Sequence, residues 1–352
     1  MARLRDWLRG LRQMAGSDLH LAAGHPPLIR AAGQISPLSG EGALPDAALR
    51  EILRTLAGDE RWTRFTREHD LDFAFPVEGV GRFRGNYFEH HQGVGAVFRS
   101  VPDRIIPIEQ LGVPEAIQRL TDLESGIVLV TGPTGSGKST TLAALVDRIN
   151  RTHSRHIVTL EDPIAFVHEN KRSVLSQRDL SAEPGGAAAA LRAALRQDAD
   201  VVLVGECESP EVIAAAIEAA GLGVLVLAAF PARSAERTVE RVIGAFPADH
   251  RERARAGLAE TLAAIVSQAL VRRTHGGRVA AHEILLRTPA LTGAIREGKT
   301  AGLDALIEGG RALGMQTLDQ SLRALVDEGA IDGHEAYLAA DDKQAFRQWA
   351  HP

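Results

Sequence analysis

The sequence predicts an α/β fold in which a domain with a parallel, doubly wound sheet follows a smaller α+β domain. At 352 residues, the chain is long enough to build two hydrophobic cores. Before about residue 100, short runs alternate polar and apolar residues, which is typical of an antiparallel sheet with one solvated face. After Pro114 the pattern changes to continuous apolar runs separated by helical stretches, as expected of strands covered on both faces.

The first domain, residues 1–100, is expected to contain several short strands and one helix. The strands have β-branched or aromatic residues between turn residues, and fall near 17–21, 27–30, 35–38, 71–75, 82–88 and 96–99. Gly33 offers a turn between the second and third strands. The helix is predicted over 46–57 from its stripe of leucine and isoleucine, with Asp46 as a possible cap.

A linker is expected at 101–114, because Pro102, Pro107 and Pro114 stiffen the chain and interrupt strand pairing. The second domain then runs over 115–300, and helical spacing dominates a C-terminal extension at 301–352. Buried strands are predicted from apolar runs at 127–130, 157–160, 201–204 and 224–227. Alanine-rich segments at 187–196 and 209–220 supply the crossover helices between them.

Bulk composition excludes several classes of protein. With 40 basic and 45 acidic residues the net charge is -5, and no basic stripe indicates binding to nucleic acid. One cysteine, Cys207, excludes an internal disulfide framework. No apolar run reaches the roughly 18 residues of a membrane-spanning helix, and no signal peptide is recognisable. We therefore expect a cytoplasmic protein with no direct membrane insertion.

A phosphate-binding loop is the strongest motif in the sequence. GxxxxGK[ST] is matched by Gly132, Pro133, Thr134, Gly135, Ser136, Gly137, Lys138, Ser139 and Thr140. The motif follows a predicted buried strand and precedes a helix expected to begin near Thr140. Glycines there allow backbone N–H groups to turn inward around an anion, while Lys138 reaches the β and γ phosphates. ATP with Mg²⁺ is the predicted ligand, the metal being bound in part by the Ser139 hydroxyl.

Two acidic side chains are candidates for the chemistry that a phosphate-binding loop cannot perform alone. Glu206 follows the apolar run 201–204, and Glu161 follows 157–160, so both fall at the carboxyl ends of predicted strands. Glu206 is the candidate general base, and either acid could bind the metal together with Ser139. The alternatives are a surface charge at position 206 and a helix cap at position 161.

The sequence resembles the type IV pilus retraction ATPases of the secretion ATPase superfamily. The resemblance rests on the loop at 132–140, on Thr159 to Ile164, on Val204-Gly205-Glu206 and on Gly314 to Asp319, and it extends over 16–99. It implies a PAS-like domain, a RecA-like ATPase domain, a Mg²⁺-dependent homohexamer, and docking on an inner-membrane pilus platform protein at the cytoplasmic side. In the family, arginines at the positions of Arg82, Arg84 and Arg99 approach the nucleotide phosphates.

The sequence departs from this family at several positions, most of them between 208 and 231. Two family histidines that contact the nucleotide site are replaced by Val224 and Pro231, and the family's Arg-Asp pair after the catalytic acid is Glu208-Ser209. Valine and proline side chains can neither donate a hydrogen bond nor carry a charge. Two hypotheses follow: an ATP-hydrolysing hexameric motor, or a weakly active regulatory paralogue that binds nucleotide within a ring formed with another pilus ATPase.

Overall fold

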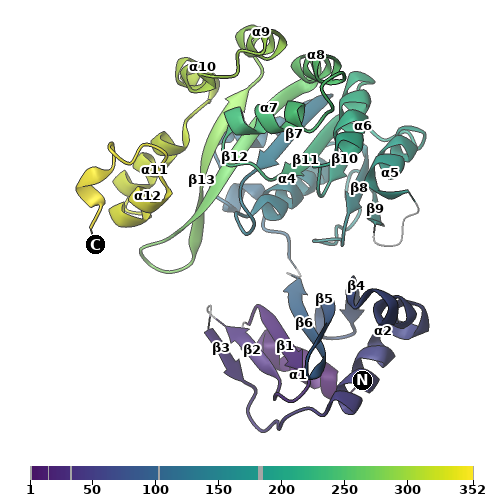
Figure 1. Ribbon diagram of the computed structural model, residues 1–352. Coiled ribbons are helices and arrows are strands. Elements are labelled where there is room, and N and C mark those ends of the chain that lie inside the picture. The colour runs from purple at the N-terminus through teal and green to yellow at the C-terminus, as the bar shows by residue number, and fades with distance from the viewer. Residues whose placement is uncertain (1, 15, 32–33, 102–103, 181–184, 352) are drawn as a thin grey trace. The chain divides into compact units, whose positions relative to one another are not determined.

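The computed structural model describes residues 2–14, 16–31, 34–101, 104–180 and 185–351 (Figure 1). Two compact units make up the chain. Unit 1 comprises Met1–Arg104 and Pro163–Phe166, and unit 2 comprises Ile105–Asp162 and Val167–Pro352. Each unit has its own sheet and its own hydrophobic core.

Unit 1 contains a six-stranded antiparallel sheet in the order β3-β2-β1-β6-β5-β4. Its elements are α1 Ala2–Gln13, β1 Asp18–Ala22, β2 Leu28–Ala31, β3 Gln34–Pro37, α2 Asp46–Glu68, β4 Asp70–Val77, β5 Gly81–His90 and β6 Gly93–Val101. Both helices bury an apolar stripe against one face of the sheet, where an aromatic core forms around Phe73, Tyr87 and Phe98. This arrangement agrees with the predicted α+β class.

Two details of unit 1 differ from the expectations. Helix α1 was not anticipated, and α2 continues beyond residue 57 because Gly58, at φ 77°, allows the helix to kink and resume. Asp46 does not cap α2, whose N-cap is Pro45; the Asp46 carboxylate instead accepts a hydrogen bond from the Val94 amide at 2.8 Å. Gly33, the expected turn residue, lies outside the described residues.

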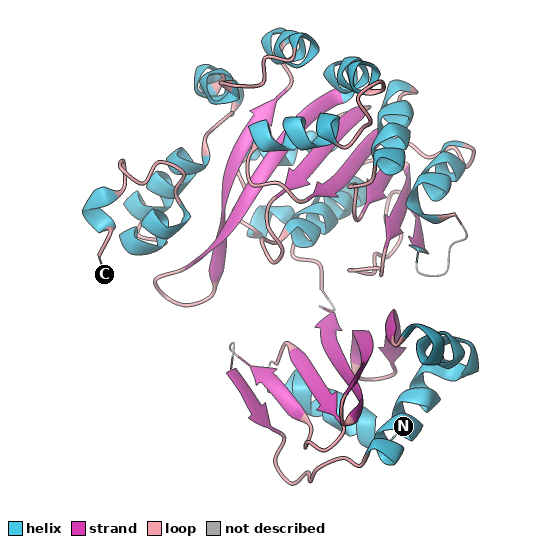
Figure 2. Cartoon of the chain, viewed as in Figure 1, coloured by secondary structure: helices cyan, strands magenta, loops and turns pink. Residues whose placement is uncertain are grey.

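Unit 2 contains a seven-stranded sheet in the order β13-β12-β7-β11-β10-β8-β9 (Figures 1 and 2). The strands are β7 Gly126–Thr131, β8 His156–Glu161, β9 Val174–Asp179, β10 Val201–Val204, β11 Leu225–Phe230, β12 Leu262–Arg272 and β13 Arg278–Leu286. All neighbouring pairs are parallel except β12 with β13. The predicted parallel sheet is therefore confirmed, with three strands, β9, β12 and β13, that were not anticipated.

Helices cover both faces of this sheet. They are α3 Glu115–Gln118, α4 Lys138–Thr152, α5 Gly186–Leu195, α6 Pro210–Gly221, α7 Ala235–Gly244, α8 Arg251–Thr261, α9 Pro289–Glu297, α10 Leu303–Gly309, α11 Leu318–Asp327 and α12 Gly333–Ala339, with 3₁₀ turns η1 Ile108–Gln110, η2 Arg119–Asp122, η4 Arg311–Leu313 and η5 Arg347–Trp349. Adjacent strand residues serve opposite faces: Leu129 packs with α6, whereas Val130 packs with α4. Continuous apolar strands follow from this double coverage.

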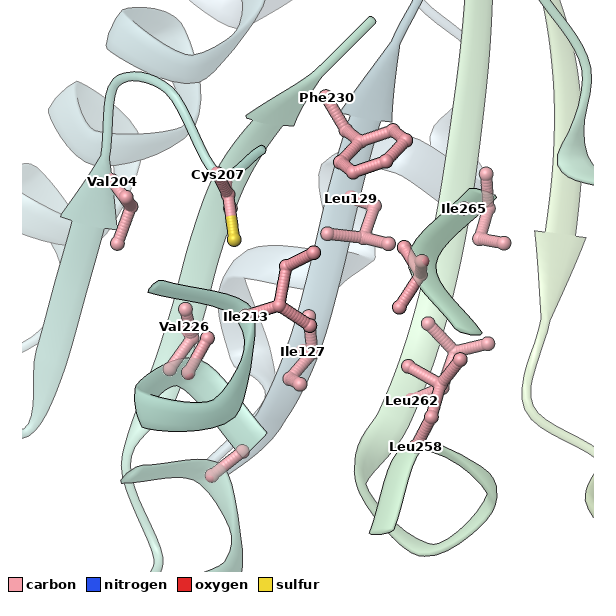
Figure 3. Packing of buried hydrophobic residues seen from close by; sticks show 14 of the residues in the cluster. Ile127, Leu129, Val204, Cys207, Ile213, Val226, Phe230, Leu258, Leu262 and Ile265 are labelled. Carbon is pink, nitrogen blue, oxygen red and sulfur yellow. The ribbon is translucent and has the colours of Figure 1, made fainter. Parts of the chain in front are cut away.

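Figure 3 shows the core on the α6 face, where the Cys207 sulfur lies among apolar side chains that include Ile213 and Val226. Burial raises the pKa of the Cys207 thiol to about 12, so the group stays protonated at neutral pH. This cysteine therefore acts as a small buried apolar residue, as the sequence predicts.

Residues 105–114, expected to belong to the linker, form part of unit 2 because Ile108 and Val113 are buried in its core. Pro102 lies outside the described residues. At the other end of the chain, α11 and α12 pack on the β12–β13 hairpin and bury Leu322 and Phe346 with Val271. Among the described residues, no helix is both long and apolar enough to cross a membrane.

Candidate nucleotide-binding site

The predicted phosphate-binding loop connects β7 to α4 at the carboxyl edge of the parallel sheet of unit 2. Gly132, Gly135 and Gly137 have φ values of 145°, 81° and 92°, which only glycine adopts without strain. Helix α4 begins at Lys138, with Gly137 as its N-cap in the left-handed conformation. The loop therefore presents its backbone N–H groups, and the positive end of the α4 dipole, at one place.

Lys138 folds back over this loop. Its ammonium donates hydrogen bonds to the carbonyl oxygens of Gly132 at 2.8 Å and Pro133 at 3.0 Å. Burial lowers the pKa of Lys138, and the negative charges of Glu208 and Glu206 partly oppose that effect. An ammonium with neutral carbonyl partners can exchange them for phosphate oxygens, which are stronger acceptors.

Both candidate acids lie at the same edge of the sheet as this loop. The parallel register pairs Val204 with Leu160, so Gly205 and Glu161 are level at the ends of β10 and β8. The Gly205 amide donates to the Leu160 carbonyl at 2.8 Å, and a Cβ at Gly205 would come within 3.3 Å of the Glu161 Cα. Because Gly205 has no Cβ, the carboxyl ends of β8 and β10 can pack closely, and Glu161 and Glu206 lie at these two ends.

The oxygen donors at this edge fit a magnesium ion bound together with nucleotide. Glu161 is 8% exposed and accepts a long hydrogen bond, 3.5 Å, from the Gln177 amide, whereas Ser139 and Glu206 are exposed. Within the described residues, no group of three or more His, Cys, Asp or Glu side chains could hold a metal. Carboxylate and hydroxyl oxygens are the ligand type that Mg²⁺ takes, together with waters and substrate phosphates.

The structure adds residues to this edge that sequence reasoning missed. Gln268 on β12 contacts the phosphate-binding loop directly, and Gln177 on β9 contacts Glu161. Glu208, noted in the sequence only as a departure from the family, has a negative charge that partly opposes the lowering of the Lys138 pKa by burial. One signal was available for Gln268, because Ser267 and Gln268 are polar residues within the otherwise apolar run 262–271. Gln177 carries no local signal, since its place beside Glu161 depends on the pairing of β8 with β9.

The two positions that lost a histidine lie at opposite edges of the sheet. Pro231 follows β11 at the carboxyl edge, level with the end of β7, because Phe230 pairs with Thr131. Val224 precedes β11 at the amino edge, where it is 7% exposed and its carbonyl accepts from the Gly126 amide at 3.2 Å. The expectation that both positions border the nucleotide site therefore fails within a subunit: parallel strand direction places only Pro231 there.

The predicted arginines of unit 1 share one face of its sheet. Arg82 and Arg84 are two positions apart on β5, so their side chains are on the same face of the sheet. The antiparallel register places Arg99 of β6 directly opposite Arg84. Arg99 donates from Nε to the carboxylate of Asp18 on β1 at 2.7 Å. Although burial raises the pKa of Asp18, hydrogen bonds from Ser17 and Arg99 outweigh that effect and hold the pKa below its usual value.

Like charges directly opposite one another destabilise a sheet. A single carboxylate, Asp18, faces three arginines in one row, since Asp18 also pairs with Arg30 on β2. Asp70 and Asp72 of β4 lie on the same face, next to Phe88 and Asn86 of β5, so this face of unit 1 carries both arginines and aspartates. Guanidinium groups match the geometry of phosphate oxygens, and the role predicted for Arg82, Arg84 and Arg99 stays a prediction.

A loop of this shape between a buried parallel strand and a helix, with acids at neighbouring strand ends, defines a P-loop nucleotide-binding protein. Comparison with known proteins makes the assignment more specific. Residues 78–297, more than half of the chain, match the family described as type II/IV secretion system protein. The chain belongs to that family, and within it to the type IV pilus retraction ATPases.

Relatives over nearly the full length support this assignment. The type IV pilus retraction ATPase PilT of Pseudomonas aeruginosa is 44% identical over 95% of this chain and 97% of that protein. A twitching motility protein of Neisseria gonorrhoeae is 41% identical over 91% and 86%. The type IV pilus ATPase PilU of P. aeruginosa, at 35% identity, covers 97% and 89%.

Solved structures agree with the fold. The crystal structure of the pilus retraction motor PilT with bound ADP superposes with a TM-score of 0.89 at 36% identity, covering 98% of both chains. The ATPase DotB of Legionella pneumophila superposes with a TM-score of 0.80 at 25% identity, covering 96% of this chain and 95% of that one. The predicted fold class, a P-loop domain after a smaller α+β domain, is therefore confirmed.

Proposed function

We propose that this chain is the ATP-hydrolysing subunit of a motor that retracts a type IV pilus and so drives twitching motility. The observation that carries the proposal is the single sheet edge at which the phosphate-binding loop, Glu161 and Glu206 occur together. A protein that only binds nucleotide has little chemical need for an acid at position 206. The retraction and twitching motility functions of the relatives support the pilus as the load.

In this mechanism the loop at 132–140 binds the phosphates of ATP through its backbone N–H groups, and Lys138 exchanges its carbonyl partners for phosphate oxygens. Glu206 orients the attacking water and accepts its proton. Ser139, Glu161 and Glu206 are the oxygen donors that would hold Mg²⁺, directly or through water. When bound, the metal neutralises charge on the phosphate oxygens.

The arginine face of unit 1 completes the proposal. Arg82, Arg84 and Arg99 are proposed to neutralise phosphate charge, because guanidinium groups match the geometry of phosphate oxygens. We expect a cytoplasmic ring of six subunits, formed by this chain alone or with another pilus ATPase, that docks on an inner-membrane platform protein. Nucleotide at the subunit boundaries would then link hydrolysis to movement of the units.

The alternative, a regulatory paralogue with weak activity, rests on the two family histidines replaced by Val224 and Pro231 and on the family arginine replaced by Glu208. The comparisons give it no support over the motor, and the retained acids weigh against it.

Steady-state phosphate release from the full chain with MgATP tests the proposal. We expect hydrolysis by the wild type, no nucleotide binding by Lys138→Ala, and a loss of about a hundredfold or more in kcat for Glu206→Gln. Glu218→Gln is the matched control, because Glu218 is an acid on α6 that pairs only weakly with Arg192, at 3.7 Å. Equal rates for Glu206→Gln and the wild type would reject Glu206 as the base. A wild type that is inactive alone, but changes the rate of an active pilus ATPase in mixture, would favour the regulatory paralogue.

A further inference from the structure

Gln268 is a polar side chain buried beneath the phosphate-binding loop. It lies on β12, next to β7, and is 3% exposed. Its amide nitrogen donates a hydrogen bond to the Ser136 carbonyl at 2.5 Å, and its amide oxygen accepts one from the Thr141 hydroxyl at 2.9 Å. One side chain thus joins the loop to the first turn of α4.

The loop also packs closely against Gln268. A Cβ at Gly132 would clash with the backbone carbonyl oxygen of Gln268, and a Cβ at Gly137 would lie 3.0 Å from the side-chain amide nitrogen of Gln268. Two of the motif glycines are therefore needed for contact with β12 as well as for their positive φ values. Because a buried amide is costly unless it is hydrogen-bonded, a glutamine here is stable only with these partners.

The bond to Ser136 fixes the direction of a neighbouring amide. In a trans peptide the C=O of one residue and the N–H of the next point in opposite directions. Anchoring the Ser136 carbonyl on Gln268 therefore directs the Gly137 N–H away from β12. Gly137 precedes Lys138 in the motif, and its N–H belongs to the set expected to bind phosphate.

A second polar contact stabilises the strand that enters the loop. The hydroxyl groups of Ser267 and Thr131 lie 2.9 Å apart, and these residues pair in register on β12 and β7. Ser267 also hydrogen-bonds Glu283 on β13. Both residues of the polar pair on β12 thus contact the motif region, one before the loop and one within it.

We propose that Gln268 is a positioning residue that holds the phosphate-binding loop in its binding shape by anchoring Ser136 and Thr141, without touching the nucleotide. The inference rests on the proposed nucleotide-binding function. It assigns part of the affinity for phosphate to a strand outside the motif.

The test measures the affinity of the full chain for MgADP by calorimetry, and the free energy of unfolding without nucleotide. Gln268→Met keeps the volume but removes both hydrogen bonds, and should weaken MgADP binding about tenfold or more. Gln268→Glu places an oxygen against the Ser136 carbonyl and should weaken binding at least as much. Gln316→Met is the matched control: it removes a 2.9 Å hydrogen bond to the His282 carbonyl on β13, a strand that pairs with β12 and not with β7, and it should leave the affinity within about twofold.

Thr141 provides an independent pair of variants if a substitution at Gln268 prevents folding. Thr141→Val removes the hydroxyl that orients the amide and should weaken MgADP binding about fivefold, whereas Thr141→Ser should retain wild-type affinity. Loss of stability without loss of affinity in Gln268→Met, or equal affinities for Thr141→Val and Thr141→Ser, would overturn the inference. A wild type without affinity for MgADP would instead reject the nucleotide site itself, and the inference with it.

Discussion

Glu283 lies on β13 against the start of α7, where it is 3% exposed and accepts a hydrogen bond from the Ala235 amide at 2.5 Å. Burial raises the pKa of this carboxyl to about 7, from an ordinary value of 4.5. The charges of Asp304 and Asp341 act in the same direction, whereas the bonds from Ala235 and Ser267 oppose it. The group is therefore protonated in the folded chain at pH values where the unfolded chain is ionised.

The sign of the effect on stability follows from proton binding. Between about pH 4.5 and 7 the folded state binds more protons at Glu283 than the unfolded state, so the free energy of unfolding falls as pH rises. The difference between a pKa of about 7 in the folded chain and 4.5 in the unfolded chain corresponds to about 3 kcal/mol. Glu283→Gln keeps an acceptor for the Ala235 amide and does not titrate. We therefore expect the variant to gain about 3 kcal/mol relative to the wild type between pH 4 and pH 8.

Urea unfolding of both proteins at constant ionic strength, without nucleotide, measures this difference. The neighbouring His282 must be separated from it, because burial lowers the pKa of His282 to about 4. Its effect has the opposite sign, since the unfolded state binds the extra proton between about pH 4 and 6.5. His282 is present in both proteins and cancels in the difference. Parallel pH profiles, within about 0.5 kcal/mol, would refute the argument by showing that Glu283 ionises near its ordinary pKa.

Two further predictions concern the departures from the family. Glu208→Gln should strengthen MgADP binding by about two- to fivefold, because it removes an exposed negative charge that attracts Lys138. The gain in affinity should shrink in high salt, and a gain that does not depend on salt would contradict the electrostatic cause. The wild type should bind ADP and a non-hydrolysable ATP analogue with similar affinity, and Pro231→His should raise the preference for the analogue about tenfold or more by restoring a hydrogen-bond donor beside the phosphates. Pro231→Ala is the control that removes the ring without adding an imidazole, and equal nucleotide preference in both variants would reject a sensing role for this position.

Much of the candidate site could be predicted from the sequence because its signals are local. The glycines and Lys138 lie within nine consecutive residues, and Gly132, Gly135 and Gly137 have the positive φ values that such a loop needs. Glu161 and Glu206 follow short apolar runs, and parallel strands bring their carboxyl ends to one edge. The fold class followed for the same reason, since apolar runs without alternation require cover on both faces.

Helix α1 shows that some errors were avoidable. Leu4, Trp7, Leu8 and Leu11 have helical spacing and are buried along one stripe, so the signal was present in the sequence.

The end of α8 carried no such signal. Helix α8 ends at Thr261 and β12 begins at the next residue, Leu262, and no glycine or proline marks this change. Pairing with β7 and β13 selects the strand conformation there, and local propensity does not.

The sequence by itself therefore determined the nucleotide-binding motif, its acids and the family. Tertiary structure decided which residues surround them. Gln268 follows the motif by more than a hundred residues, yet contacts it because β12 pairs beside β7. Val224 and Pro231 are seven positions apart, but the length of β11 separates them to opposite edges of the sheet. Both results depend on strand order and direction, which long-range pairing fixes and no local pattern encodes.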